Sequence, residues 1–348
     1  MKKSFVFASI IAVSMGIAGA APASAEELKL TGSGASFPFP IYSAWFKDFS
    51  KQTSGVTVDY QAKGSGAGIQ DFTNNTVDFA ASDAAMKDDE IAKVKQGVVL
   101  LPMTAGEIVL SYNLEGVKEL KLPRDVYPEI FAGKITKWSD PKIAAANPGV
   151  KFPDQDITVV ARSDASGTTF VFTGHLSAIS PDFEKTVGHG TTVQWPTHFV
   201  KAPKNDGVTA TIKQTPGAIG YIEYGYALAT KQPMATLQNK AGKYIVPDDE
   251  GGKAALASAE FPDKKLPGSD VPDLRVWVSD PAGAKAYPIA TFTWMLFYRD
   301  QDDAKAKILR ELVKYGLTKG QAAAPKMGYI PLPENVAARV EKAAMLIQ

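Results

Sequence analysis

The sequence contains no cysteine and only three histidines among its 348 residues. Without cysteine the chain forms no disulfide, no thiolate metal site and no cysteine nucleophile, and it offers no N-terminal cysteine to a lipid anchor. His175, His189 and His198 lack the spacing that is typical of metal ligands. We therefore expect no metal and no cofactor, and a fold that depends on a large hydrophobic core.

The chain also lacks an excess of charge of either sign. It carries 38 lysine and arginine residues against 37 aspartate and glutamate residues, for a formal net charge of +1. Such a chain has no overall field that attracts nucleic acid or an anionic membrane, so any anion site must be local. Nucleic acid is not an expected partner.

The N-terminus has the features of an export signal. Lys2 and Lys3 precede the apolar residues 5–20, and Ala23-Ser24-Ala25 matches an A-x-A cleavage site. Cleavage after Ala25 leaves 323 residues and lowers the formal charge to −1, because both lysines are removed. No later apolar stretch reaches the length of a membrane span, so we expect an exported, unanchored protein.

Strand-like and helix-like segments alternate along most of the chain. Residues 28–31, 56–61 and 77–80 predict strands, and the glycine-rich residues 64–68 predict a flexible turn. The aromatic spacing over 39–50 predicts a helix, and residues 69–75 predict the start of another. This alternation is typical of an α/β fold with parallel strands, and the length favours two lobes.

The C-terminal third contains one less regular stretch. Residues 247–273 are rich in proline, glycine, aspartate and lysine, which predicts a surface excursion with a short helix over 254–259. Residues 304–315 and 335–347 predict amphipathic helices.

Four small polar turns each follow a predicted strand. They are residues 34–37, 64–66, 81–83 and 162–168. In open α/β sheets, ligands bind at the carboxyl ends of the strands. Each turn alone is compatible with simple chain reversal, but four such turns at one edge predict a ligand site.

The fourth turn is the most informative. Residues 159–172 predict a strand, a turn with Arg162 and Asp164, and a helix that starts at Ser166-Gly167-Thr168. Free N–H groups at a helix start attract anions, and a guanidinium suits an oxyanion. The alternative is an Arg–Asp salt bridge beside an ordinary helix cap.

Asp83 is an unexpected residue for an anion site. One interpretation is a helix N-cap before Ala84-Ala85-Met86. The other uses protonation: a carboxylate only accepts hydrogen bonds, so a ligand that still carries a proton, such as hydrogen phosphate, can donate to it. Sulfate has no such proton, and the mismatch would discriminate against it.

Six motifs resemble, in order and through essentially the whole mature chain, those of the periplasmic phosphate-binding proteins of ABC importers. They are residues 30–38 (LTGSGASFP), 60–68 (YQAKGSGAG), 78–83 (DFAASD), 133–138 (GKITKW), 162–169 (RSDASGTT) and 216–224 (PGAIGYIEY). The resemblance implies a two-lobed type II periplasmic binding protein fold with a hinge and a central ligand cleft. It implies phosphate binding without metal or catalysis, in a periplasmic monomer that delivers its ligand to the permease subunits of the importer.

The resemblance also implies how the lobes and the site are made. The first lobe would comprise residues 26–105 and 289–348, and the second would comprise 106–288, with hinge crossings near 106–112 and 287–293. Closure would bring together the implied phosphate ligands, which are Ser36, Phe37, Ser65 and Asp83 from the first lobe and Arg162, Ser166, Gly167 and Thr168 from the second, with Asp164 holding Arg162.

Two positions depart from the family pattern. Ser36 stands where the family more often has threonine, and serine keeps the hydroxyl donor. Glu107 stands where many relatives have an apolar residue, so the packing of the predicted hinge is in question.

Other functions remain open at this point. Ser166 as the nucleophile of a secreted phosphatase or hydrolase lacks the Gly-x-Ser-x-Gly elbow and an evident base, so we expect no enzyme. The fold could instead bind arsenate, sulfate or molybdate, or serve in surface adhesion. Asp83 argues against sulfate but not against arsenate, which keeps a proton at neutral pH.

Overall fold

The computed structural model describes residues 27–348, so the predicted export signal and its cleavage site lie outside the described residues. The strands are β1 (Leu28–Gly34), β2 (Val56–Ala62), β3 (Phe79–Ser82), β4 (Val98–Asn113), β5 (Lys121–Leu122), β6 (Thr158–Arg162), β7 (Val200–Ala202), β8 (Ala218–Glu223), β9 (Thr236–Gln238), β10 (Tyr244–Ile245) and β11 (Ala290–Tyr298). The helices are α1 (Phe39–Gln52), α2 (Ser65–Thr73), α3 (Asp88–Ile91), α4 (Val126–Phe131), α5 (Pro141–Ala146), α6 (Gly167–Ile179), α7 (Pro181–Thr186), α8 (Lys204–Gln214), α9 (Tyr224–Thr230), α10 (Asp249–Leu256), α11 (Asp303–Tyr315), α12 (Gln321–Ala323) and α13 (Glu334–Ala344), with a π-helical turn at Gly316–Gly320 and a 3-10 turn at Pro325–Met327. Within 27–348, no helix combines the length and the apolar character that crossing a bilayer requires.

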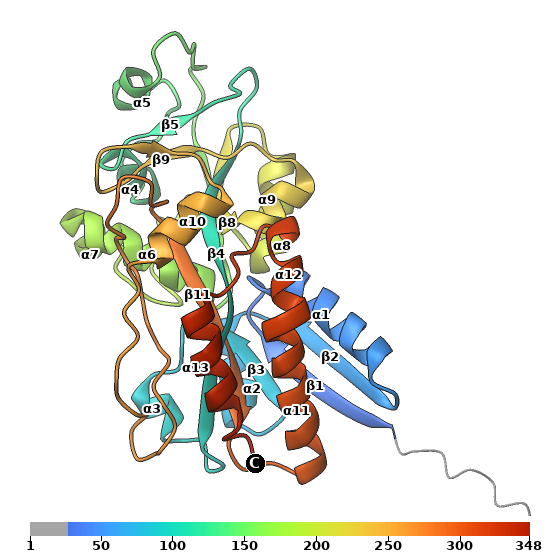
Figure 1. The fold of residues 1–348 in the computed structure, drawn as a ribbon. Helices are drawn as coiled ribbons and strands as arrows, with labels where there is room; N and C mark the ends of the chain where they lie inside the picture. Colours follow the sequence, from blue (N-terminus) through green and yellow to red (C-terminus); the bar gives the residue numbers. More distant parts are fainter. Residues whose placement is uncertain (1–26) are drawn as a thin grey trace, which may run out of the picture.

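One long strand connects the two halves of the main sheet, whose order is β2-β1-β3-β11-β4-β8-β6-β7. The strand β4 runs through the middle of the molecule (Figure 1) and pairs with β11 over Val98–Glu107 and with β8 over Ile108–Asn113. We call β2, β1, β3, β11 and Val98–Glu107 the first half-sheet, and Ile108–Asn113, β8, β6 and β7 the second half-sheet.

The strands that carry the predicted turns are parallel within each half-sheet. β1 pairs in parallel with β2 and β3, and β6 pairs in parallel with β7 and β8. The predicted α/β architecture with parallel strands is therefore confirmed. β11 and β4 are the exceptions, because β11 pairs antiparallel with β3 and β4, and β4 also pairs antiparallel with β8.

Helix α1 forms where the aromatic spacing predicts it. Tyr42, Trp45, Phe46 and Phe49 are buried on one face of the helix, and the Phe46 ring meets Phe79 of β3 edge-on at 5.5 Å between centroids. Helices α11 and α13 are also found where their amphipathic patterns predict them.

Helix α2 begins earlier than the sequence suggests. We expected a flexible turn over 64–68 and a helix from residue 69, but the helix starts at Ser65. It follows Gly64, whose φ of 101° is a conformation that glycine adopts readily. The glycines at 66 and 68 serve close packing. A Cβ on Gly68 would lie 2.4 Å from Cα of Gly34, so α2 lies directly against β1.

Residues 247–273 are not a simple surface excursion, because Ala255, Leu266 and Val271 are at most 2% exposed. The segment that follows α10 descends beside β11 to the level of α3 and then returns (Figure 1). Phe261 contacts Phe292 of β11 at 5.2 Å between ring centroids, and Arg275 donates to the Met86 carbonyl at 2.8 Å.

Glu107 lies where β4 changes its pairing partner, and it is 1% exposed. Burial, and after it the charges of Asp248 and Asp249, raise the pKa of Glu107 well above its ordinary value. The raised pKa favours the neutral acid, which a buried site accommodates more easily than a carboxylate.

We predict that Gly68→Ala destabilises the protein, because the added methyl group meets backbone atoms of β1 and β3. Overpacking of this kind lowers the free energy of unfolding by roughly 1–3 kcal/mol, which urea denaturation would measure. Gly55→Asn is the control, since nothing lies within 4 Å of a Cβ at Gly55 and asparagine tolerates the left-handed conformation. Equal stability of Gly68→Ala and the parent would contradict the direct packing of α2 on β1.

Candidate anion-binding site

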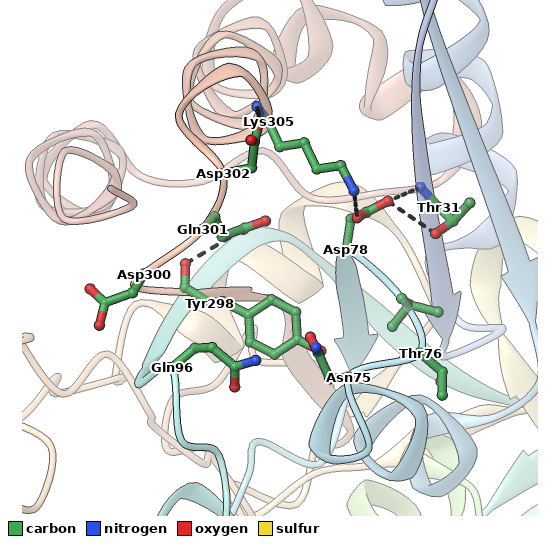
Figure 2. Close-up of a pocket in the computed structure, with 11 residues that line it drawn as sticks. Thr31, Asn75, Thr76, Asp78, Gln96, Tyr298, Asp300, Gln301, Asp302 and Lys305 are labelled. Atoms are coloured by element: carbon green, nitrogen blue, oxygen red, sulfur yellow. Dashed lines mark hydrogen bonds and ion pairs between the residues drawn. The ribbon is translucent and has the colours of Figure 1, made fainter.

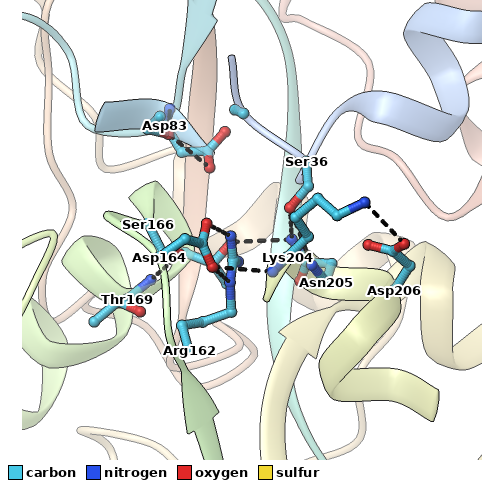
Figure 3. Close-up of polar contacts among 12 residues, drawn as sticks. Ser36, Asp83, Arg162, Asp164, Ser166, Thr169, Lys204, Asn205 and Asp206 are labelled. Atoms are coloured by element: carbon cyan, nitrogen blue, oxygen red, sulfur yellow. Dashed lines mark hydrogen bonds and ion pairs between the residues drawn. The ribbon is translucent and has the colours of Figure 1, made fainter. Parts of the chain in front are cut away.

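Polar residues from both half-sheets meet at their junction, on the turns that follow β1, β2, β3, β6 and β7. Ser36 and Asp83 come from the first half-sheet, whereas Arg162, Ser166 and Asn205 approach from the second (Figure 3). None of these five residues is more than 4% exposed. The structure thus brings the four predicted turns together and adds a fifth.

The other predicted site residues lie in the same junction. Phe37 follows Ser36 and is fully buried, and Ser65 is the buried first residue of α2. Gly167 and Thr168 are the first two residues of α6. A Cβ on Gly167 would lie 2.3 Å from Oγ of Ser65, so only glycine allows the two half-sheets to approach this closely.

Arg162 is held by Asp164 through two parallel hydrogen bonds. Nε donates to Oδ1 at 2.8 Å, Nη2 donates to Oδ2 at 2.6 Å, and Nη1 donates to Oγ1 of Thr168 at 3.2 Å. Burial alone would raise the pKa of Asp164, but the hydrogen bonds and charge of Arg162 hold it below its ordinary value. A guanidinium has five N–H donors, so two remain for another acceptor.

Backbone N–H groups add further donors at the junction. Ser166 caps α6 by accepting from the Thr169 N–H at 3.0 Å, which leaves the N–H groups of Gly167 and Thr168. Within residues 27–348, neither these two nor the N–H groups of Ser36 and Phe37 donate to a protein acceptor. Both the predicted salt bridge and the predicted cap are present, and they leave buried donors unmatched.

Asp83 is a buried carboxylate beside these donors, since its Oδ2 would lie 2.6 Å from a Cβ on Gly167. Its Oδ1 accepts from Oγ1 of Thr293 at 2.8 Å and its Oδ2 lies 3.4 Å from Oγ of Ser65. Burial raises the pKa of Asp83 to about 7, even though Thr293, Arg162 and Ser65 act to lower it. Helix α3 starts only at Asp88, so the interpretation of Asp83 as a helix N-cap is wrong.

Direct hydrogen bonds join the two half-sheets around this cluster. The backbone N–H and Nδ2 of Asn205 each donate to Oγ of Ser36 at 3.0 Å. The Gly66 N–H donates to the Ala165 carbonyl at 3.0 Å, and the hydroxyl of Tyr226 donates to the Ser36 carbonyl at 2.6 Å. The two half-sheets are therefore in contact through residues of the site itself.

Two residues of the cluster, Asn205 and Thr293, are not among the predicted site residues. Asn205 follows a strand of only three residues, β7, but Pro203-Lys204-Asn205 does repeat the pattern of a turn before a helix. Thr293 lies inside β11, beside a register shift in its pairing with β4. Nothing in the local sequence marks it.

The hydrogen bonds of Ser166 and His175 bear on the alternative of a hydrolase. No hydrogen bond joins Ser166 to a histidine, and His175 is occupied by the Tyr127 hydroxyl and the Ser279 carbonyl. No cluster of three or more His, Asp or Glu within 27–348 is arranged to hold a metal ion.

A separate polar hollow of about 340 Å³ lies at the start of α11. Figure 2 shows that Asp78 holds Lys305 and Thr31 there. These side chains already satisfy one another, so the hollow does not rival the buried cluster as an anion site.

Comparison with known proteins gives consistent matches. The model of the PBP superfamily domain matches residues 19–318. Among curated relatives, the phosphate-binding protein PstS of Xylella fastidiosa (strain 9a5c) is 36% identical over 326 residues, which cover 92% of this chain and 86% of the relative. The PstS proteins of Haemophilus influenzae and Methanocaldococcus jannaschii are each 37% identical, over 91% and 88% of this chain and 92% and 82% of their own length.

Solved structures match over similar lengths. A phosphate-binding protein from Stenotrophomonas maltophilia superimposes with a TM-score of 0.73 at 22% identity, over 91% of this chain and 94% of that one. A putative phosphate ABC transporter substrate-binding protein from Clostridium perfringens matches with a TM-score of 0.63 at 15% identity, over 88% and 100%. These likenesses confirm the predicted two-lobed type II periplasmic binding protein fold.

We predict that Asp83→Asn gains stability over the parent, in ligand-free protein, as the pH rises. The folded parent keeps a proton on Asp83 up to a pKa of about 7, whereas the unfolded chain loses it near 3.8. The contribution of this group to the free energy of unfolding therefore falls as the pH rises from about 4 to about 7, by roughly 4 kcal/mol at most.

Urea denaturation at pH 5 and pH 8 measures this difference. Asp89→Asn is the control, because its side chain is 71% exposed. An Asp83→Asn effect that is the same at both pH values would rule out the raised pKa.

Proposed function

Because the chain belongs to the PBP superfamily and, within it, to the family of phosphate-binding proteins named PstS, we propose that it binds inorganic phosphate between two lobes and delivers it to the membrane subunits of an ABC importer. The observation that carries the proposal is the set of buried donors without a protein acceptor at the junction of the half-sheets. A tetrahedral oxyanion is compact and offers four oxygens to such donors.

The proposed ligand contacts follow from the donor set. The N–H groups of Ser36, Phe37, Gly167 and Thr168 donate to the anion, as do the two remaining N–H groups of Arg162. The hydroxyls of Ser36, Ser65, Ser166 and Thr168 add further donors. Leaving a buried donor unmatched costs about 1–3 kcal/mol, so the ligand stabilises the closed arrangement.

Asp83 gives the site its proposed selectivity. As a carboxylate it accepts the proton of hydrogen phosphate, and arsenate shares that proton and shape. Sulfate has no proton to donate and would meet a buried negative charge. Arsenate is therefore the alternative oxyanion that this chemistry does not exclude, whereas sulfate and molybdate are disfavoured.

We further propose a division into lobes that follows the half-sheets. The prediction of 26–105 with 289–348 against 106–288 agrees with the change of partner in β4. The contacts of Phe261 and Arg275 favour one refinement, in which residues 261–275 move with the first lobe. Cleavage after Ala25 would release the protein as a monomer in the periplasm, where binding without catalysis is its task.

We predict that Arg162→Ala weakens phosphate binding by more than tenfold, because a charge-assisted donor is removed from a buried site. Isothermal titration of ligand-stripped protein with phosphate measures the change. Arg299→Ala is the matched control, because it removes an arginine that pairs with Asp270, whose side chain is 50% exposed. This variant is expected to retain the parent affinity. An affinity of Arg162→Ala within twofold of the parent would exclude Arg162 from the site.

We predict that sulfate binding depends on pH in the parent but not in Asp83→Asn. Sulfate requires protonated Asp83, whose pKa is about 7. Above pH 7 the apparent affinity for sulfate therefore decreases, by up to about tenfold for each pH unit. Equilibrium dialysis with labelled sulfate between pH 6 and pH 9 tests this. A flat profile in both proteins would contradict the role of Asp83 as the selective acceptor.

A further inference from the structure

Asn205 makes four hydrogen bonds in the centre of the site and is 0% exposed. Its Nδ2 donates to Oγ of Ser36 at 3.0 Å and to Oγ1 of Thr168 at 3.1 Å. Its Oδ1 accepts from the Glu223 N–H at 2.9 Å, and its own backbone N–H donates to Oγ of Ser36. The amide thus lies between the turns after β1, β6 and β7 and the end of β8.

The orientation of the Asn205 amide is determined by its partners. A backbone N–H can only donate, so the amide atom that faces the Glu223 N–H must be the oxygen. The NH₂ group must then face the two hydroxyls. Lys204 supports this placement, because its N–H donates to Oδ1 of Asp164 at 2.9 Å and fixes the turn before α8.

This orientation determines which way the two hydroxyl protons point. A hydroxyl oxygen has two lone pairs and one proton. Ser36 Oγ accepts twice from Asn205, and Thr168 Oγ1 accepts from Asn205 and from Arg162. With both lone pairs occupied, each hydroxyl can only donate, and neither donates to a protein acceptor among residues 27–348.

We propose that Asn205 is a positioning residue that fixes the Ser36 and Thr168 hydroxyls as hydrogen-bond donors to the bound anion. This inference rests on the proposed phosphate site and adds a determinant of its specificity. With the hydroxyls held as donors, Asp83 is left as the acceptor for a single ligand proton. Because Asn205 and Ser36 belong to different half-sheets, Ser36 is set in this direction only when the lobes are closed.

A double-mutant cycle on the mature, ligand-stripped protein tests the proposal, with phosphate affinity measured by isothermal titration. Asn205→Ala is expected to weaken phosphate binding by about tenfold, because both hydroxyls can then rotate away from the ligand. In a Ser36→Ala/Thr168→Val background the same substitution is expected to change the affinity by less than twofold. A purely structural role would give the same fold-change in both backgrounds, and that result overturns the proposal.

Two further variants keep the test decisive. If the Ser36→Ala/Thr168→Val protein binds phosphate too weakly to measure, a cycle with Ser36→Ala alone replaces it. The fold-change in affinity caused by Asn205→Ala should then be at least threefold smaller than in the parent. If Asn205→Ala does not fold, Asn205→Asp retains the acceptor for the Glu223 N–H and turns both hydroxyls towards position 205. Asn205→Asp should then weaken phosphate binding more in the parent than in the Ser36→Ala/Thr168→Val background, where only the added charge acts. Equal losses of affinity in the two backgrounds overturn the proposal.

The controls separate this inference from the proposed function. Asn335→Ala, at an exposed position on α13, retains the parent affinity. Thermal unfolding without phosphate reports any loss of stability independently of binding. A parent that does not bind phosphate refutes the proposed function, whereas a parent that binds phosphate but gives an additive cycle refutes only the role of Asn205.

Discussion

The structure depends on buried hydrogen-bond donors that lack a protein acceptor where the two half-sheets meet. The turns after β1, β2, β3, β6 and β7 meet there, and among residues 27–348 the buried N–H groups of Ser36, Phe37, Gly167 and Thr168 find no protein acceptor. Arg162 has already used its contacts with Asp164 and Thr168 and still has N–H groups left over. Buried donors are costly unless they are matched, which is why the proposed anion would stabilise the closed arrangement.

The proposed closure would use the connection between the half-sheets as its hinge. β4 is one continuous strand that belongs to both, and its pairing changes from β11 to β8 at Glu107. Rotation about such a junction is the hinge motion expected of a two-lobed binding protein. Contacts such as Asn205 with Ser36 form only between the half-sheets, so a ligand that bridges them shifts the population towards the closed form.

Much of this arrangement is predictable from the sequence, for physical reasons. Strands that end in small polar turns predict a ligand edge, and Ser166-Gly167-Thr168 predicts a capped helix start, because both are local patterns. Thr293 is not predictable, since its side chain reaches Asp83 only through the antiparallel insertion of β11 and the register shift beside it. The glycines of α2 suggested a flexible turn because their purpose, close packing of Gly66 against Ala165 and of Gly68 against β1, is a tertiary property.

The central claim is that the buried donors are matched by an anion that carries a proton for Asp83. Isothermal titration of ligand-stripped protein with phosphate at pH 8, in the absence and presence of a large excess of sulfate, tests it most directly. The account predicts one phosphate per chain with an affinity that sulfate leaves unchanged. Absence of phosphate binding, or displacement of phosphate by sulfate at comparable concentration, would contradict it.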